Sequence, residues 1–466
     1  MVFSSLTFLL LFLPVTIGLY FLAPGIRCKN TVLLIASALF YAWGEPVWVF
    51  ALIALALLVW IFSAAVAKWQ RQWLRKIALF LGVAGPMGVL LFVKYGGFLL
   101  APAFEWFGIT LPEVTMPLGI SFFTFQIVTY IVDVYRDREL YQENPFDLML
   151  YISCFPQLVA GPIVRYQDVA AQMTDRQTTM DDFAAGMKRF ACGLGKKVIF
   201  ANVCGMVVSA VTESQGLYGM SVLGSWYMAI VYSLQIYFDF SGYSDMAIGM
   251  GRIFGFRYAE NFDYPYMSTR VSEFWRRWHI SLGTFFREYV YIPMGGNRVG
   301  AVRQIWNLLV VWALTGLWHG ANMNFVIWGL YYFVLLTLEK YVLKGLMDKL
   351  PPLLCGICTY AAVLVGWIIF YFTDTAEMLV WLKALVGIGA EGTLPLMTSQ
   401  VWLVMKQYSW FPLAAFAGAF PLWKALRTEV LEKLNGVYII WLVVVFVLSV
   451  LMIVGQSYNP FIYFRF

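Results

Sequence analysis

Long apolar runs separated by short polar segments recur along the whole chain. A transmembrane helix needs roughly 20 mostly apolar residues. Several runs are short or interrupted by proline and glycine, and irregular backbone is tolerated at membrane depth only where protein or a cavity surrounds it. We therefore expect an all-α polytopic membrane protein with roughly 10–13 transmembrane helices plus re-entrant segments. The candidate spans lie near 5–22, 31–44, 47–67, 77–96, 117–135, 146–162, 190–212, 219–240, 304–319, 324–341, 353–372, 376–390, 400–422 and 436–456.

Composition supports a protein embedded in lipid along its whole length. Of the 466 residues, 61% are hydrophobic and 12% are charged, whereas soluble domains carry about 25% charged residues. We predict a single membrane-embedded domain over residues 1–466. The aromatic content of 18% is typical of interfacial belts and a lined internal cavity. The net charge of +6 is modest, so membrane lipids rather than nucleic acid are the expected surroundings.

The distribution of basic residues predicts the orientation in the membrane. Bases follow the first, third and fifth candidate spans, and by the positive-inside rule these loops are cytoplasmic. Lys424, Arg427 and Lys433 precede the last span. We therefore expect the N-terminus and the C-terminal tail, residues 457–466, to lie outside the cytoplasmic (inner) membrane. The bases after the early spans are Arg27, Lys29, Lys68, Arg71, Arg75, Lys76, Arg136 and Arg138.

The first apolar segment and the cysteines add two smaller predictions. The N-terminal run lacks the basic region of a cleaved signal peptide, so we expect it to remain as the first span. Cys355 and Cys358 form a CxxC pair, but within an apolar stretch, which favours small buried side chains over a redox or metal pair. With two histidines in the chain, we expect no metal site.

The densest cluster of charge lies in residues 252–303. Within it, helical periodicity predicts one amphipathic helix over 272–288 at the cytoplasmic interface, with His279 at the edge of its apolar face. Periodicity alone favours a basic membrane anchor. The alternative is a mouth for an anionic thioester donor, whose phosphates Arg276 and Arg277 could clamp. The apolar face would contain Phe274, Trp275, Trp278, Leu282, Phe285 and Phe286.

Both histidines directly follow a tryptophan. His319 lies 16 residues after Arg303, roughly 24 Å along a helix and thus deep in the membrane. An ionisable residue at that depth is a functional candidate, and imidazole is a common general base. A packed histidine bonded to a backbone carbonyl is the alternative, and for His279 the two interpretations are equally strong. Four polar residues before this block could line the same cavity or pack between helices: Asp239, Ser241, Ser244 and Asp245.

Three runs carry a resemblance to a known family: YFDFSGYSDMAIG (237–249), the stretch 261–298 around EFWRRWHISLGTFF, and LTGLWHGANMNFVIWG (314–329). They resemble the membrane-bound O-acyltransferase (MBOAT) family, in particular its bacterial polysaccharide O-acetyltransferases, and the likeness extends over nearly the whole chain. It implies spanning helices around a central pore, with His319 catalytic and His279 the second family histidine. We add Trp278, Trp318, Asp239 and Asn322 to the two arginines as candidate substrate-binding residues.

The same resemblance implies the reaction and the partners. The donor would be cytosolic acetyl-CoA or another acyl thioester, with no bound cofactor. The acceptor would be an extracellular or cell-wall polysaccharide of the alginate, cellulose or peptidoglycan type. An extracytoplasmic acetyltransferase of the SGNH, AlgX or AlgJ type would complete delivery. A polysaccharide transporter or flippase is the alternative outside the enzymes, but it would show repeated halves and paired intramembrane charges. A lipid or protein O-acyltransferase of the same superfamily is the alternative among the enzymes.

The last residues, SYNPFIYFRF, resemble the C-terminal motif of DltX, the small partner of the D-alanyl-transferring members. The likeness implies that Tyr463 carries the acyl group, with Arg465 beside it. From the residues alone, an interfacial anchor is the stronger interpretation, because Tyr, Phe and Arg are what a helix end at a membrane surface carries. The polysaccharide and the acyl group, acetyl or D-alanyl, remain open at this point.

Overall fold

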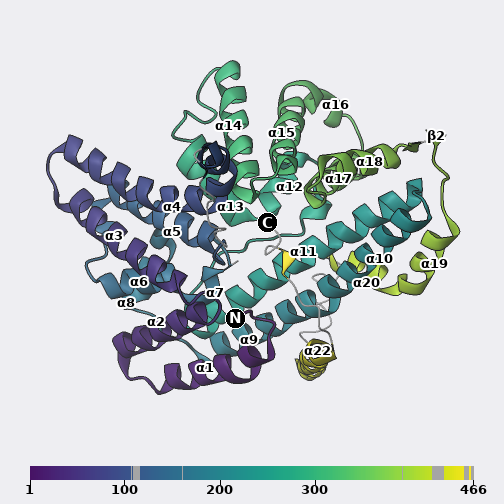
Figure 1. Ribbon diagram of the computed structural model, residues 1–466. Coiled ribbons are helices and arrows are strands. Elements are labelled where there is room, and N and C mark those ends of the chain that lie inside the picture. Colours follow the sequence, from purple (N-terminus) through teal and green to yellow (C-terminus); the bar gives the residue numbers. More distant parts are fainter. Residues whose placement is uncertain are drawn as a thin grey trace. The chain divides into compact units, whose positions relative to one another are not determined.

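The computed structural model describes residues 1–106, 108, 116–159, 161–390, 392–421, 435–455 and 461–462. Helices make up nearly all of the regular structure in this part of the chain (Figure 1). Its strands, β1 (Ile388–Gly389) and β2 (Gly392–Thr393), form one short antiparallel hairpin. The all-α prediction is therefore confirmed.

The chain folds into two compact units. The first comprises residues 1–190 and 243–260, and the second comprises 191–242 and 261–466. The single membrane-embedded domain over 1–466 stays a prediction. The helices that begin in the first unit are η1 (Phe8–Phe12), α1 (Leu13–Leu22), α2 (Gly25–Gly44), α3 (Trp48–Lys68), α4 (Gln72–Trp106), α5 (Ile120–Arg136), η2 (Arg138–Leu140), α6 (Pro145–Ser153), α7 (Phe155–Leu158), α8 (Tyr166–Thr174) and α9 (Met180–Gly195).

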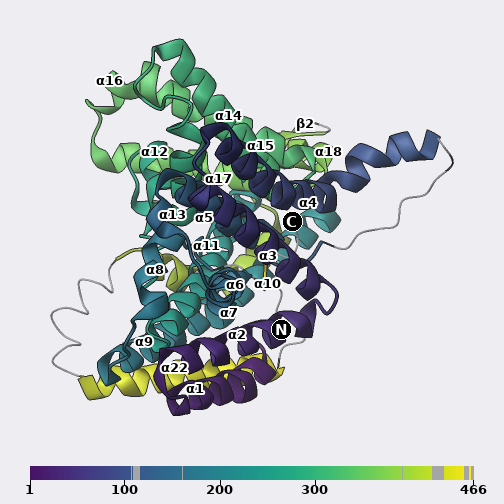
Figure 2. The same ribbon diagram turned by 90° about the vertical axis from the view of Figure 1, so that its left-hand side faces the viewer.

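The second unit contains both histidines and most of the charged central block. In it α14, α15 and α17 pack side by side (Figures 1 and 2). The helices that begin in this unit are η3 (Lys196–Ala201), α10 (Asn202–Tyr218), α11 (Val222–Ile253), η4 (Pro265–Met267), α12 (Val271–Arg277), α13 (Ile280–Phe286), η5 (Arg287–Tyr291), α14 (Ala301–His319), α15 (Met323–Leu338), η6 (Glu339–Leu343), α16 (Lys344–Met347), α17 (Pro352–Tyr371), α18 (Thr375–Leu385), α19 (Ser399–Tyr408), α20 (Trp410–Gly418) and α22 (Asn435–Gly455).

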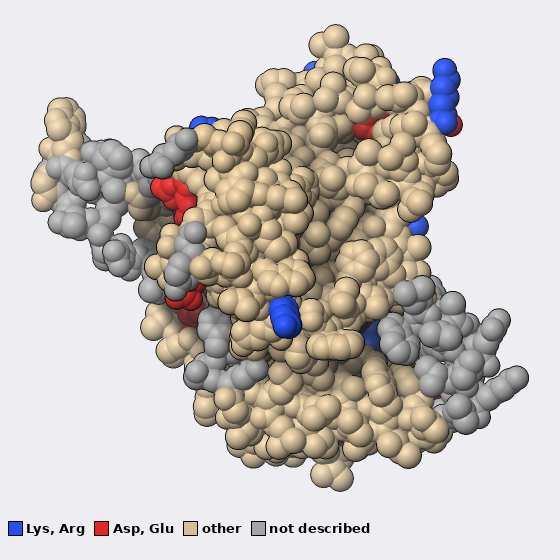
Figure 3. Space-filling model, turned by 90° about the vertical axis from the view of Figure 1, so that its right-hand side faces the viewer, with Lys and Arg blue, Asp and Glu red and all other residues tan. Residues whose placement is uncertain are grey.

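Six helical stretches among the described residues are long and apolar enough to cross a membrane. On the face drawn in Figure 3, few Lys, Arg, Asp or Glu side chains are visible, as expected for a surface that contacts lipid. The six stretches are Trp48–Lys68, Gln72–Gly97, Met180–Leu217, Met323–Met347, Pro352–Tyr371 and Gly436–Gly455.

The count of six is smaller than the 10–13 spans predicted, partly because some predicted spans are not continuous helices. The segment 376–390 forms the 11-residue α18, about 16 Å long, and then turns into the β hairpin. The segment 400–422 is divided between α19 and α20. The segment 146–162 is broken at Cys154, between α6 and α7, as its prolines led us to expect.

The predicted amphipathic helix over 272–288 is wrong as a single element. The structure has two short helices, α12 and α13, separated by Trp278 and His279. His279 has φ +46°, in the left-handed region, which a continuous right-handed helix cannot contain. Helical periodicity persists across the break in the sequence, which is why the pattern did not reveal it.

Candidate active site

Close packing of α14 against α15 positions His319. A Cβ added to Gly316 would lie 2.4 Å from the carbonyl oxygen of Phe325, and one added to Gly329 would lie 2.4 Å from that of Trp312. Only glycine permits so close an approach of two backbones. α14 ends at His319, so this contact fixes the helix end that carries the histidine.

Aromatic rings surround the half-buried imidazole of His319. Its centroid is 5.0 Å from those of Trp328 and Phe370, at interplanar angles of 84° and 88°. The Trp318 ring lies at 4.8 Å and the Phe325 ring at 6.2 Å. These rings come from α14, α15 and α17. They place the imidazole in surroundings poor in water, where electrostatic interactions are stronger than in bulk solvent.

Asn324 fixes this aromatic wall and was missed from the sequence. Its side chain is fully buried, and its amide Nδ2 donates to the carbonyl oxygens of Ile369 and Phe370 at 3.3 and 3.2 Å. It therefore ties α15 to the part of α17 that carries Phe370. Asn322, which the sequence suggested instead, is the exposed N-cap residue of α15. The sequence signal that could have identified Asn324 is its position as a polar residue inside an apolar helix.

The turn that holds His279 is stabilised by Asn261. The Asn261 Oδ1 accepts hydrogen bonds from the backbone N–H and the hydroxyl of Ser281, at 3.0 and 2.9 Å. The Asn261 carbonyl oxygen accepts from the N–H of Ile280 at 2.9 Å. These bonds satisfy the first N–H groups of α13. Asn261 thus holds the two residues that follow His279 and stabilises its left-handed conformation.

His279 itself is 5% exposed. Its Nδ1 lies 3.5 Å from the Ser281 hydroxyl. Burial lowers the pKa of His279 to about 4, because an apolar environment disfavours the charged imidazolium. The ring is therefore neutral near pH 7 and able to accept a proton or a hydrogen bond.

Trp318 brings the two histidines into one site. Its indole centroid is 6.1 Å from the imidazole of His279, at an interplanar angle of 80°, and 4.8 Å from that of His319. The three residues belong to the same unit. Two histidines that are 40 positions apart in sequence therefore both contact the ring of one tryptophan.

Trp278 continues the aromatic surroundings on the His279 side. Its ring lies 4.8 Å from that of Trp367 and 5.1 Å from that of Phe262, and it is 5% exposed. The ring of Trp367 in turn lies 5.8 Å from that of Phe370, and the Phe370 ring contacts His319. The candidate residues Trp278 and Trp318 are therefore both part of the structure around the histidines.

The two candidate arginines differ in their surroundings. Arg277 forms ion pairs with Asp263 at 3.1 Å and with Glu273 at 3.0 Å, so its charge is already compensated within the protein. Arg276 is exposed and has no ion pair with any described residue. Of the two, Arg276 is the better placed to meet an anion from outside.

The two acids of α11, Asp239 and Asp245, form ion pairs with basic residues. Asp239 forms an ion pair with Lys197 at 2.6 Å in the second unit. Asp245 forms one with Arg189 at 2.8 Å in the first unit. Tyr463 and Arg465 lie outside the described residues.

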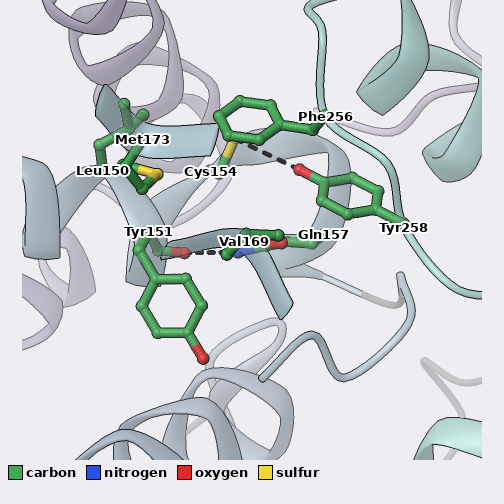
Figure 4. Close-up of a pocket in the computed structure, with 8 residues that line it drawn as sticks. All are labelled: Leu150, Tyr151, Cys154, Gln157, Val169, Met173, Phe256 and Tyr258. Atoms are coloured by element: carbon green, nitrogen blue, oxygen red, sulfur yellow. Dashed lines mark hydrogen bonds between the residues drawn. The ribbon is translucent and has the colours of Figure 1, made fainter. Parts of the chain in front are cut away.

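A small cavity in the first unit is too small for a substrate. Its volume is about 10 Å³, room for one water at most. Figure 4 shows the hydroxyl of Tyr258 pointing at the sulfur of Cys154, at 3.9 Å, and the amide of Gln157 donating to the carbonyl of Tyr151. Neither histidine lines this cavity. Its lining residues are Leu150, Tyr151, Cys154, Gln157, Val169, Met173, Phe256 and Tyr258.

Comparison with known proteins identifies the family. Residues 112–379 match the model of MBOAT, the membrane-bound O-acyltransferase family. The chain is 37% identical to the probable alginate O-acetylase AlgI of Pseudomonas putida over the full length of both chains. It is 32% identical to a peptidoglycan O-acetyltransferase of Helicobacter pylori, covering 83% of this chain and 80% of the relative.

A more distant relative transfers a different group. A teichoic acid D-alanyltransferase of Bacillus subtilis is 32% identical over 49% of this chain and 60% of the relative. The matched family region contains the paired histidines, their aromatic surroundings and the α14–α15 contact. A multi-pass helical chain with this match and a full-length relative belongs to the membrane-bound O-acyltransferase family, and its activity is that of an O-acyltransferase.

Proposed function

We propose that this protein moves an acetyl group from cytosolic acetyl-CoA across the cytoplasmic membrane for O-acetylation of an extracytoplasmic polysaccharide. The full-length similarity to an alginate O-acetylase and the extensive similarity to a peptidoglycan O-acetyltransferase support this acceptor class. The observation that carries the chemistry is the packing of both His279 and His319 against the ring of Trp318.

His319 is proposed as the general base. It ends a helix and is half-buried, so its ring has protein on some sides and an approach on another. A base must take a proton from the attacking hydroxyl at the moment of attack, and this contribution is typically worth 10²–10⁴-fold in rate. His279 is proposed as the second functional histidine, neutral at the pH of the cell and held by the Asn261 turn.

Tyr463 is proposed as a covalent carrier between donor and acceptor. In the first step its oxygen attacks the thioester carbonyl, a C–O bond forms and the C–S bond breaks. The phenolic proton passes by way of His319 to the leaving thiolate. In the second step an acceptor hydroxyl attacks the tyrosyl ester, and its proton returns to the phenolic oxygen. Splitting one transfer into two is the logic of covalent catalysis.

The remaining site residues are proposed to bind the donor. Exposed Arg276 would meet the phosphates of coenzyme A, since guanidinium groups recognise phosphate strongly. Arg277, Trp278 and Trp318 would form the wall along which the thioester enters. Exposed Asn322 lies three residues beyond His319, where it could contact the substrate. Asp239 has a different place, because its carboxylate accepts a hydrogen bond from the backbone of Ile462.

The membrane topology and partners complete the proposal. Both ends of the chain would be extracytoplasmic. An acetyltransferase of the SGNH, AlgX or AlgJ type would then receive the acetyl group and pass it to the polymer. The positive-inside pattern supports the orientation, and the relatives' acceptors, which lie outside the membrane, favour an outward transfer.

The test is the ester content of purified cell-surface polysaccharide. A strain lacking the gene is complemented with the wild-type chain or with His319→Ala, at equal membrane abundance. We expect mild alkali to release acetate from the polysaccharide of the wild-type complement. The His319→Ala complement and the uncomplemented deletion strain should release background acetate. D-Alanine measured in the same hydrolysate tests the D-alanyl donor. Unchanged acetate in the deletion strain would exclude the proposal.

A further inference from the structure

A buried ion pair joins Lys197 and Asp239 in the second unit. Lys197 Nζ lies 2.6 Å from Asp239 Oδ1, and the two side chains are 3% and 1% exposed. Lys197 also donates to Asn202 Oδ1 at 3.1 Å. Removing two charges from water costs several kcal/mol per ion, and an apolar pair of similar volume is often at least as stable. Stability alone is therefore a weak reason for this pair.

The backbone is arranged to bring the two charges together. A Cβ added to Gly242, three residues after Asp239, would lie 2.8 Å from the carbonyl oxygen of Gly193 and 2.9 Å from the N of Lys197. Glycine therefore lets α11 lie directly against the start of η3. η3 is a π-helical stretch, and such bulges occur often at functional sites because they re-aim side chains.

The second oxygen of Asp239 holds a distant part of the chain. Asp239 Oδ2 accepts a hydrogen bond from the backbone N–H of Ile462 at 2.7 Å. Phe461 and Ile462 are 3% and 4% exposed, and the ring of Phe461 lies 5.2 Å from that of Phe240. One carboxylate thus joins α11, η3 and the segment Phe461–Ile462. Lys197 orients this carboxylate and balances its charge.

We propose that Asp239, held by Lys197, is a positioning residue that docks the C-terminal segment by its backbone for each round of acyl transfer. Part of this inference rests on the proposed function, because the residue after Ile462 is the proposed carrier Tyr463. A backbone hydrogen bond fixes the position of the chain without contacting the side chain that reacts. Asp239 is thereby assigned to the enzyme's own segment rather than to the donor or the acceptor.

Two double variants separate the charge from the acceptor atom. Lys197→Met with Asp239→Asn removes both charges but keeps an oxygen that can accept from Ile462. Lys197→Met with Asp239→Leu removes the charges and the acceptor. Ile462→Pro removes the donor N–H and leaves the ion pair intact. The matched control, Arg270→Met with Asp348→Asn, removes an ion pair of the same unit whose aspartate is half exposed, and such pairs contribute little.

Two readouts are needed on the full chain in detergent or nanodiscs. Hydrogen–deuterium exchange of the C-terminal peptide reports docking, and acetyl transfer from acetyl-CoA reports function. In the Lys197→Met, Asp239→Leu variant we expect the C-terminal peptide to lose its protection from exchange. Acetyl transfer should fall about tenfold to a hundredfold, the usual range for a hydrogen bond to a charged group. The Lys197→Met, Asp239→Asn variant should keep part of the protection and part of the transfer. The control should match the wild type in both readouts. Ile462→Pro should lower transfer as the Leu variant does.

The outcomes separate this inference from the carrier hypothesis. Loss of protection with full transfer, or loss of transfer with full protection, would overturn the docking role of Asp239. Tyr463→Phe should keep the protection of the peptide. If Tyr463→Phe also keeps full transfer while the Leu variant and Ile462→Pro do not, the carrier role fails and the docking role stands. Should the Leu variant not fold, Ile462→Pro decides alone, because it changes only the docked segment.

Discussion

His319 ends α14 with its ring nearly perpendicular to those of Trp328 and Phe370. The rings around His319 contain no group that accepts a proton near neutral pH, so among them the imidazole is the basic group. A half-buried base needs an open side toward the attacking hydroxyl, and its position at a helix end provides one. This placement supports the proposed role of His319 as a general base.

His319→Ala is expected to lower acyl transfer roughly 100- to 10,000-fold, the usual contribution of a general base. Membrane abundance and the elution profile in detergent should stay near those of the wild type. Leu314→Ala, which changes an exposed side chain of the same helix, is the control and should remain active. Transfer above a tenth of the wild-type rate in a well-expressed His319→Ala would make the histidine a packing residue.

The turn between α12 and α13 shows the limit of inference from sequence. The burial of Phe274, Trp278 and Leu282 agrees with the predicted apolar face. The break at His279 was not predicted, because it depends on Asn261, which lies 18 positions away and outside the periodic pattern. Likewise the pairing of Asp239 with Lys197 depends on a long-range contact of two helices. The motif histidines could be predicted, but their arrangement around Trp318 could not.

Two substitutions at His279 separate the turn from the imidazole. Asparagine tolerates the left-handed conformation, whereas for a β-branched residue this conformation costs roughly 1–2 kcal/mol of free energy. We expect His279→Asn to keep the apparent melting temperature and to weaken transfer, and His279→Val to lower both. The measurements are thermal unfolding in detergent and the KM for acetyl-CoA, which should rise if His279 lies at the donor entrance. Equal transfer by His279→Asn and the wild type would leave the residue a structural role only.

The contact of α14 with α15 makes a prediction about stability. Gly316→Ala would place a methyl group 2.4 Å from the Phe325 carbonyl oxygen, and overpacking of this kind typically costs 1–3 kcal/mol. We expect a lower apparent melting temperature and weaker transfer, because the helix end that holds His319 would move. Gly345→Ala in α16 has no neighbour within 4 Å and should be neutral or slightly stabilising. Identical melting curves for the two variants would contradict the packing argument.

At the scale of the whole molecule, the orientation can be tested with a native cysteine. Cys28 is exposed and lies between Arg27 and Lys29 in the first turn of α2, a segment predicted to be cytoplasmic. In a Cys358→Ser background, a membrane-impermeant maleimide should label Cys28 only after permeabilisation of spheroplasts. Pro46→Cys, in the next turn, should be labelled in intact spheroplasts. The reverse pattern would invert the topology and place both chain ends in the cytoplasm.

Transfer across a bilayer raises a distance problem that a single catalytic residue does not solve. The hydrocarbon core is about 30 Å thick, and the proposed thioester donor and polysaccharide acceptor lie on opposite sides of it. A tethered nucleophile allows the acyl group to travel while water and coenzyme A stay on their own sides. The docking of Phe461 and Ile462 against α11 supports the C-terminal segment as that tether, and Tyr463 is the next residue along the chain.

Tyr463→Phe is therefore expected to be as inactive as His319→Ala, although it removes a single oxygen atom and preserves shape. A phenol with an ordinary pKa of about 10 is a poor nucleophile near neutral pH, so acylation of Tyr463 should also need His319. Mass spectrometry of the C-terminal peptide after incubation with acetyl-CoA should show an acetyl adduct in the wild type. The adduct should be absent from both variants, while Tyr463→Phe should still bind acetyl-CoA. Full transfer by Tyr463→Phe would instead mean direct attack of the acceptor hydroxyl on the thioester, with the C-terminal segment reduced to an anchor.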